Sequence, residues 1–165
     1  MQTIYDLVVI GGGISSSTFI ANVMKQGFEG KIAVVEAGRG FGGRCSSRYR
    51  YKDKKLALNH GCPNFNIKNF QKNSCLDNFI KELSDKKFIK SLDNSFFELD
   101  ENYKFSKEYH NEFYFGDVYT STTNMSKLVE NLIHLYNTKD QIDFYFQTLI
   151  IKLNFKSELW NILSN

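Results

Sequence analysis

The feature that most constrains the fold is a run of three glycines, Gly11–Gly13, which directly follows a short apolar segment. Residues 4–10 (IYDLVVI) are almost continuously apolar, which favours a strand buried on both faces of a parallel sheet. Residues 14–26 favour a helix, and residues 31–35 (KIAVV) repeat the strand pattern. The order strand, glycine turn, helix, strand predicts a βαβ unit in an α/β fold with a parallel sheet. The helix residues expected to face the strand are Ile14, Thr18, Ala21 and Met24.

The glycine turn resembles the dinucleotide-binding fingerprint G-x-G-x-x-G. Gly11 and Gly13 match its first two glycines, and the small Ser16 stands at the third. The second glycine lets a pyrophosphate approach the backbone, and the helix that follows offers free N–H groups to it. Glu36 ends the second strand, where a carboxylate can bind both ribose hydroxyls and would repel a 2′-phosphate, which argues against NADP. The alternative is a glycine-rich turn of any α/β protein with Glu36 as a solvated strand end; the combined pattern favours the nucleotide.

A basic, glycine-rich segment follows, Glu36-Ala-Gly-Arg-Gly-Phe-Gly-Gly-Arg-Cys-Ser-Ser-Arg48. Two adjacent glycines followed by Arg44 suit close backbone approach to a phosphate, with a bidentate side chain beside it. The alternative is a basic surface loop that contacts RNA or a membrane, since all four arginines lie within residues 39–50. The net charge of only +3, and the position of the cluster directly after the fingerprint, favour a cofactor. We therefore expect neither a nucleic-acid partner nor a membrane partner.

The segments VVIGGGISSS and VVEAGRGFGGRCSSR together resemble the N-terminal FAD-binding region of the flavin amine oxidases, and most closely the small renalase-like oxidoreductases. The resemblance implies a Rossmann-like FAD/NAD(P)-binding domain, FAD as the cofactor, and hydride transfer to FAD from an amine or a reduced nicotinamide. In that family the loop at residues 42–44 lies along the FAD pyrophosphate and ribityl chain. The cofactor-binding residues that the resemblance implies are Gly11, Gly13, Ile14, Ser15, Ser16, Glu36, Ala37, Arg39, Gly42, Gly43, Arg44, His60, Gly61 and Ile150.

Three later segments are similar to the family more weakly. Residues 59–65 correspond to a segment beside the flavin, in which His60, Gly61 and Phe65 fit the family pattern. Residues 123–128 are similar to the start of the family's next helix. Residues 147–150 and Trp160 are similar to its following strand pair, where main-chain atoms near Ile150 would contact adenine. His60 is either a proton carrier or, as the residue type favours, structural. Cys62 is either redox-active or, more typically, a small buried thiol.

The family's chain continues into a substrate-binding sheet and a late glycine-acid motif, whereas this sequence stops at Asn165. We therefore expect one FAD-binding Rossmann-like domain over residues 1–165, truncated relative to the family, with an inserted or substrate-side β subdomain over residues 64–118. No catalytic residue is assigned. Two functions stay open: an oxidoreductase acting on a small-molecule amine or NAD(P)H, and a non-catalytic dinucleotide-binding fragment, or half of a split flavoprotein completed by a second chain.

The rest of the chain gives coarser expectations. Residues 37–63 favour a loop with a short helical piece, residues 74–84 and 124–137 favour amphipathic helices, and residues 142–155 and 159–163 favour a hairpin-like pair of strands. Thr123 or Asn124 can cap the second of these helices. Three cysteines without a CxxC pair predict no disulfide framework and no metal site, and so a reducing cytoplasm. No apolar run is long enough to span a bilayer.

Overall fold

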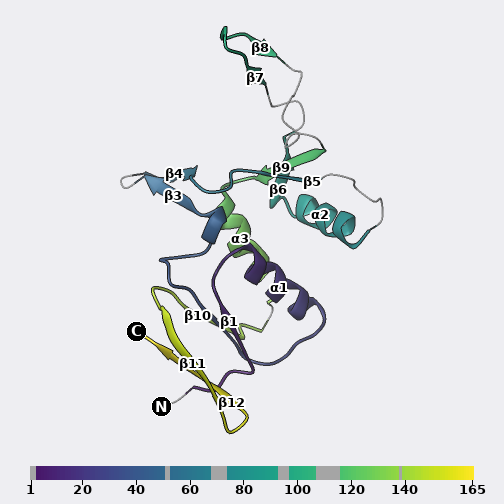
Figure 1. Cartoon of the computed structure of the whole chain (residues 1–165). Coiled ribbons are helices and arrows are strands. Elements are labelled where there is room, and N and C mark those ends of the chain that lie inside the picture. Colours follow the sequence, from purple (N-terminus) through teal and green to yellow (C-terminus); the bar gives the residue numbers. More distant parts are fainter. Residues whose placement is uncertain (1–2, 51–52, 68–73, 93–96, 107–115, 138) are drawn as a thin grey trace.

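The computed structural model describes residues 3–50, 53–67, 74–92, 97–106, 116–137 and 139–165 (Figure 1). Its centre is a parallel sheet of three strands, β1 (Leu7–Ile10), β2 (Ile32–Val35) and β10 (Ile142–Tyr145), in the order β1-β2-β10. Both outer strands run in register with β2, since Leu7 and Ile142 each lie opposite Ile32. The α/β fold with a parallel sheet that the sequence predicts is confirmed.

The two apolar runs differ in burial because only β2 is a central strand. All four residues of β2 are buried, as the prediction for a doubly covered strand requires. In β1 the first three residues are half-buried, and Ile10 is 52% exposed. The expectation that this first strand is buried on both faces is therefore wrong, because an apolar run does not distinguish an edge strand from a central one.

Two helices, α1 (Ile14–Lys25) and α3 (Met125–His134), pack beside each other and against the sheet (Figure 1). The prediction for the inner face of α1 is wrong at Ile14, which is 37% exposed, and the half-buried Thr18 is not among its buried residues. Ser17 takes a core position instead because its hydroxyl donates to the Ile14 carbonyl at 2.9 Å, so its burial leaves no polar atom unpaired. The buried face consists of Ser17, Ile20, Ala21 and Met24.

Residues 37–63 contain more regular structure than the sequence predicts. The expected short helical piece is η1 (Gly43–Cys45), a single 3₁₀ turn. It is followed by an antiparallel hairpin of β3 (Ser47–Arg50) and β4 (Asp53–Asn59), where the sequence predicts a loop. The hairpin was not recognisable because its strands are rich in Arg, Lys and Asp, without the apolar alternation that marks a half-buried strand.

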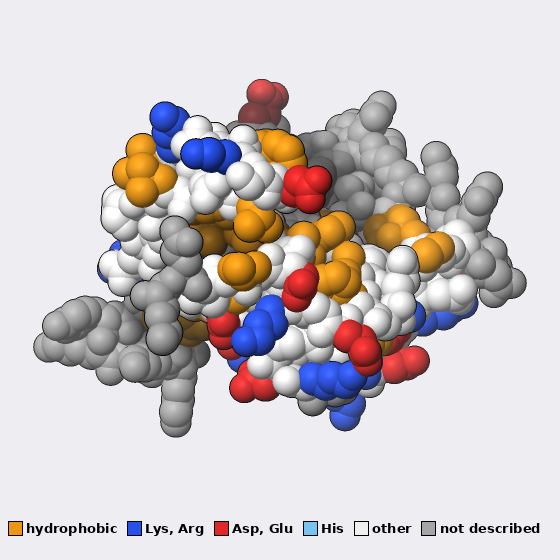
Figure 2. Space-filling model, turned by 90° about the horizontal axis from the view of Figure 1, so that it is seen from below, with side chains coloured by type: hydrophobic (Ala, Val, Ile, Leu, Met, Phe, Trp, Pro, Cys, Tyr) orange, Lys and Arg blue, Asp and Glu red, His pale blue; other side chains and the backbone are white. Residues whose placement is uncertain are grey.

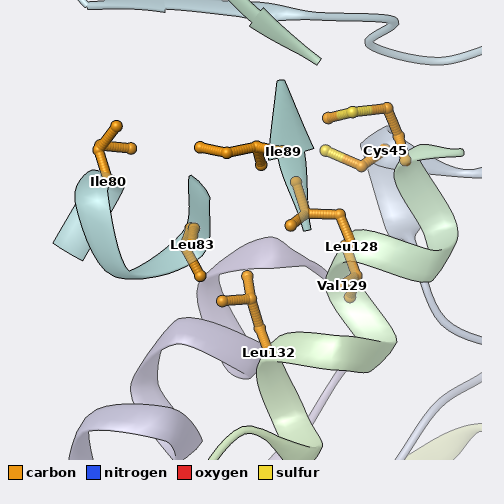
Figure 3. Close-up of a cluster of buried hydrophobic side chains, with 8 residues drawn as sticks. Cys45, Ile80, Leu83, Ile89, Leu128, Val129 and Leu132 are labelled. Atoms are coloured by element: carbon orange, nitrogen blue, oxygen red, sulfur yellow. The ribbon is translucent and has the colours of Figure 1, made fainter. Parts of the chain in front are cut away.

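A second packing unit joins α2 (Cys75–Asp85) to the antiparallel sheet β5-β9-β6, formed by β5 (Phe65–Ile67), β9 (Asp117–Ser121) and β6 (Ile89–Ser91). Figure 3 shows the apolar side chains that α2, β6 and α3 contribute to one shared cluster. The small β7–β8 hairpin (Glu98–Leu99 and Phe105–Ser106) projects away from it (Figure 1). The subdomain expected over residues 64–118 stays a prediction, and residues 68–73, 93–96 and 107–115 within it lie outside the described residues.

The C-terminal strands differ from the expected pair. The chain turns at residues 146–149, where Gln147 has a φ of +54°, so the expected strand over residues 142–155 is wrong. Its first part is β10 of the parallel sheet, and its second part, β11 (Ile150–Lys156), forms an antiparallel hairpin with β12 (Leu159–Ser164). Most side chains of this hairpin are exposed, and apolar atoms appear on the surface in Figure 2, which views the molecule from below. No helix of the described residues is long and apolar enough to cross a membrane.

Candidate functional site

Two glycine-rich segments that lie about thirty residues apart in the sequence touch each other beyond the end of β2. The turn at Gly11–Gly13 is joined to β2 by a hydrogen bond from the Gly11 amide to the Val35 carbonyl, at 2.7 Å. The Gly42 amide donates to the Gly12 carbonyl at 2.9 Å, and Gly13 and Gly42 form a parallel bridge. The fingerprint turn (Gly11–Gly13) and the Gly-Gly-Arg loop (Gly42, Gly43 and Arg44) therefore form one surface, although they were identified separately in the sequence.

Glycine is required in this loop by close backbone contacts. Gly42 has a φ of +136°, and a Cβ there would lie 2.7 Å from the Cα of Ser46. A Cβ on Gly43, which has a φ of +53°, would lie 3.4 Å from the Cα of Gly13. Both conformations are ones that side-chain-bearing residues rarely adopt. Gly42 and Gly43 thus allow the backbone of this loop to pack closely against neighbouring backbone, beside the fingerprint turn.

Glu36 is held at the end of β2 by two backbone amides. Its Oε2 accepts from the Gly12 amide at 2.6 Å, and its Oε1 accepts from the Gly38 amide at 2.5 Å. Ala37 lies in the exposed turn that this second bond closes, and the exposed Arg39 follows that turn. An ionised carboxylate has about four acceptor positions, so two bonds leave capacity for further donors. The carboxylate is therefore fixed in orientation and still able to accept from ligand hydroxyls.

The N-terminus of α1 differs from the N-termini of the other two α-helices. Ser74 caps α2 by accepting from the Asp77 amide, and Asn124 caps α3 by accepting from the Lys127 amide, as the sequence allowed. At α1 the N-cap residue is Gly13, which has no side chain to accept from the first turn, and no acidic residue lies in that turn. Ile14 and Ser15 are exposed there, and Ser16 is half-buried. The positive end of the α1 dipole is thus left uncapped beside the glycine turn.

The segment around His60 and Gly61 packs against the backbone of the Gly-Gly-Arg loop. The Cys62 amide donates to the Arg44 carbonyl at 2.8 Å, and a Cβ on Gly61 would lie 2.1 Å from the same oxygen. One imidazole nitrogen of His60, Nε2, lies 3.1 Å from the Ser46 hydroxyl. The structure therefore brings these two predicted residues against the loop, while the side chains of Arg39 and Arg44 are exposed.

Ile150 approaches the same region through the chain that precedes it. The Thr148 amide donates to the Glu36 carbonyl at 3.1 Å, and the Gln147 amide donates to the Gly38 carbonyl at 2.9 Å. These two bonds hold the start of β11 beside the turn that positions Glu36. All the residues predicted for the site thus come from segments that are hydrogen-bonded to one another; their contact with a cofactor stays a prediction.

A hydrogen-bond network that supports the Gly-Gly-Arg loop could not be recognised from the sequence. The Ser47 amide donates to the Ser126 hydroxyl at 2.7 Å, and the Ser126 amide donates to the Ser47 hydroxyl at 3.1 Å. The Asn59 carboxamide oxygen accepts from the Ser47 hydroxyl at 2.7 Å and from the Met125 amide at 3.0 Å. These side chains close the N-terminus of α3 and tie it to β3 and β4. Ser47 lies at the end of the glycine-rich segment, whereas only the weak similarity at residues 59–65 and 123–128 pointed to Asn59 and Ser126.

The chemistry that the site offers is binding through amides and one carboxylate. Within the described residues, no group of three or more His, Cys, Asp and Glu side chains could hold a metal ion. His134 is exposed and makes an edge contact with the ring of Phe144, and His110 lies outside the described residues. The arrangement of an uncapped helix end, close backbone turns and a fixed acid suits an anionic ligand that also carries hydroxyl groups.

Comparison with protein families agrees with this geometry. Residues 9–83 match the model of the NAD(P)-binding Rossmann-like domain. The matched region begins within β1 and ends within α2, and it contains the glycine turn, α1, β2 and the Gly-Gly-Arg loop. The domain is thus a Rossmann-like dinucleotide-binding fold, as the sequence predicts. A search of curated proteins found no match.

Several solved structures are similar to the chain at low sequence identity. A candidate protoporphyrinogen oxidase from Exiguobacterium sp. 255-15 is 11% identical, with a TM-score of 0.59 over 96% of this chain and 56% of its own. A geranylgeranyl bacteriochlorophyll reductase-like protein from Thermoplasma acidophilum is 18% identical, with a TM-score of 0.48 over 93% and 32% of the two chains. The chain therefore spans little more than half of the first structure, and the likeness shows the fold alone.

Proposed function

We propose that the chain binds FAD through the adenosine diphosphate half of the cofactor, at the surface formed by the glycine turn, Glu36 and the Gly-Gly-Arg loop. The observation that carries the proposal is the pairing of an uncapped α1 N-terminus with a carboxylate fixed 2.6 Å from the Gly12 amide. The helix end suits the pyrophosphate, and the carboxylate suits the ribose hydroxyls. FAD carries both groups in one molecule.

The groups that would hold FAD are the amides of Ile14 and Ser15 for the pyrophosphate and the Glu36 carboxylate for the adenosine ribose. Gly13 has no atom within 4 Å of the position where a Cβ would lie, so the backbone at the helix start can be approached closely. Main-chain atoms at Ile150 would meet the adenine, because the start of β11 is held beside the Glu36 turn. When bound, FAD would supply hydride acceptance from an amine or a reduced nicotinamide.

The resemblance to the flavin amine oxidases, and to their renalase-like branch, supports an oxidoreductase as the function of the complete protein. The preference for FAD over NADP rests on Glu36, because a carboxylate at this position repels a 2′-phosphate. The chain's contribution is to bind and orient the cofactor.

Calorimetric titration of the purified chain tests the proposal. We expect FAD and ADP to bind and riboflavin to bind much more weakly, because the contacts belong to the ADP half. Glu36→Gln keeps the size of the side chain but loses its charge, and we expect it to weaken FAD binding roughly tenfold, or by about 1.4 kcal/mol. The matched control is Glu29→Gln, an exposed acid paired with Lys139, which should leave the affinity unchanged. Absence of FAD binding, or equal affinities for the chain and Glu36→Gln, would contradict the proposal.

A second candidate is a dinucleotide-binding half that needs another chain to form the flavin site. It is favoured by the 56% of the similar oxidase structure that this chain spans. Peroxide production by the FAD-loaded chain, with an amine or NADH as the donor, distinguishes the two. Steady production by the isolated chain would rule out the non-catalytic half. The second candidate would be supported if the isolated chain binds FAD without turnover and the addition of a second chain restores turnover.

A further inference from the structure

Two of the three cysteines lie on neighbouring backbones. Cys45 ends η1, and Cys62 lies seventeen residues later, after β4. The Arg44 carbonyl, one peptide unit before Cys45, accepts from the Cys62 amide at 2.8 Å. The Ser46 carbonyl, on the other side of Cys45, accepts from the Gly61 amide at 3.4 Å. The backbones at Cys45 and Cys62 are therefore about as close as two hydrogen-bonded strands. A disulfide can span such a separation.

Their side chains also meet. Cys45 is 7% exposed and belongs to the buried cluster formed with α2, β6 and α3, and Cys62 packs against the same cluster. Figure 3 shows Cys45 at one end of this cluster, on the side opposite Ile80. Burial raises the pKa of the Cys45 thiol, and the neighbouring Cys62 thiol raises it further. The backbone hydrogen bonds and the shared cluster therefore place the two side chains beside each other in the reduced protein.

The two thiols differ in exposure in a way that suits an ordered reaction. Cys62 is half-buried, and its thiol donates to the Asn64 carbonyl at 2.7 Å, whereas Cys45 is buried. Cys62 is therefore the more accessible of the two thiols, and the buried Cys45 lies beside it. The third cysteine, Cys75, is exposed at the start of α2 and provides an internal reference for an accessible thiol.

We propose that Cys45 and Cys62 form a reversible intramolecular disulfide, a redox modification site directly behind the Gly-Gly-Arg loop. The oxidant is a low-molecular-weight disulfide such as glutathione disulfide. The Cys62 thiolate attacks one of its sulfur atoms and releases one glutathione thiolate, leaving a mixed disulfide. The Cys45 thiolate then attacks the Cys62 sulfur and releases the second glutathione. Two protein thiols are oxidised by two electrons, and both protons pass to the released glutathione.

The bond would act on the loop that carries Gly42 and Gly43. It would join η1 covalently to the segment at residues 60–62, which in the reduced protein is held by backbone hydrogen bonds. Closing this loop removes conformational freedom from the unfolded chain, so the oxidised form should melt at a higher temperature. In a reducing cytoplasm the thiols would be the resting state, and the disulfide a transient, regulatory one.

Peptide mapping of the whole chain tests the proposal. Trypsin cleaves after Arg44, Arg48, Lys55 and Lys68, so Cys45 and Cys62 fall on separate peptides. After incubation with glutathione disulfide and alkylation of remaining thiols, we expect these two peptides to be joined and Cys75 to be either alkylated or glutathionylated. Dithiothreitol should separate them. The link should persist in Cys75→Ser and be absent in Cys62→Ser, which should retain a glutathione-free Cys45.

The map of the unaltered chain decides the question even if a variant folds poorly. A stable glutathione adduct on Cys62 with a free Cys45 would overturn the proposal. The proposal would also be overturned by a link between two protein molecules or by a link that involves Cys75. It would equally be overturned if Cys45 and Cys62 stay unmodified while Cys75 reacts. If the Cys45 and Cys62 peptides are joined but the melting temperature is unchanged, the disulfide site is supported and its stabilising effect is overturned.

Discussion

At the scale of single residues, the glycines of the site fall into two groups that serve different purposes. Gly42 and Gly61 are required by the protein itself, because a Cβ at either position would collide with backbone atoms of residues 44–46. Gly13 has an ordinary φ of −94°, and a Cβ there would have no atom within 4 Å. The fold therefore has room for a side chain at Gly13, and under the proposed function a glycine is needed there because the ligand approaches the backbone.

This difference predicts opposite effects of two alanine substitutions. Gly13→Ala should cost only about 0.5–1 kcal/mol of unfolding free energy, because alanine is a poorer N-cap than glycine, but should weaken FAD binding at least tenfold. Gly61→Ala should cost about 1–3 kcal/mol by overpacking against the Arg44 carbonyl. Urea unfolding and FAD titration measure the two effects. An unchanged FAD affinity in Gly13→Ala would contradict the assigned role of the turn.

At the scale of elements, Glu82 joins three segments that are distant in the sequence. It lies on α2, accepts from the Lys25 ammonium of α1 at 3.1 Å, and accepts from the hydroxyl of Tyr136, which follows α3. Its side chain is 24% exposed. The Tyr136 hydrogen bond, together with the Lys25 contacts, lowers the pKa of the Glu82 carboxyl against the opposing effect of burial. The carboxylate form therefore stabilises the packing of α2 on the two other helices.

The lowered pKa predicts how this stabilisation depends on pH. The contribution is fully present above the ordinary carboxyl pKa of about 4.5 and is lost as the pH falls through the lower pKa of the folded state. Glu82→Gln should lose about 1 kcal/mol at pH 7, and its difference from the unaltered chain should shrink in acid. Urea titrations at pH 7 and pH 4 measure this. Glu130→Gln, which removes a surface pair with Lys127, is the control, and a pH-independent difference would contradict the assignment.

The sequence predicted the elements whose local patterns determine them. The apolar stripe of α3 is buried at Met125, Leu128, Val129, Leu132 and Ile133, as its helical spacing indicates. Its last predicted position, Tyr136, lies beyond the helix end because α3 stops at His134. On the inner face of α1 the prediction is correct at Ala21 and Met24, whereas Ser17 could not be predicted because its self-satisfied hydroxyl leaves no apolar signal. The end of β10 could not be predicted either, because the positive φ at Gln147 has no apolar signature. Of the candidate site, the fingerprint and Glu36 were readable, whereas the Ser47–Ser126 pair depends on tertiary contact alone.

At the scale of the whole molecule, α1 and α3 pack on the parallel sheet, and the β11–β12 hairpin extends from its lower end (Figure 1). The hairpin carries large apolar side chains that are more than half exposed. These are Ile151, Phe155, Leu159, Trp160 and Leu163. Isolated two-stranded hairpins are marginally stable in water, so the strength of this one depends on few contacts besides its own ladder. The aromatic pair of Phe155 and Trp160, with ring centroids 5.2 Å apart, is one of them.

Trp160 is the single tryptophan of the chain, so its fluorescence reports on this hairpin alone. Because the side chain is 64% exposed, the emission of the dilute native chain should be that of a water-exposed indole and should be strongly quenched by acrylamide. Unfolding in urea should change the emission maximum little. Trp160→Phe should remove the signal and change the unfolding free energy by no more than about 0.5 kcal/mol, as expected for a surface position. A short-wavelength emission protected from acrylamide in the dilute native chain would contradict the exposed hairpin. The same change appearing only as the protein concentration rises would mean that a second copy covers it.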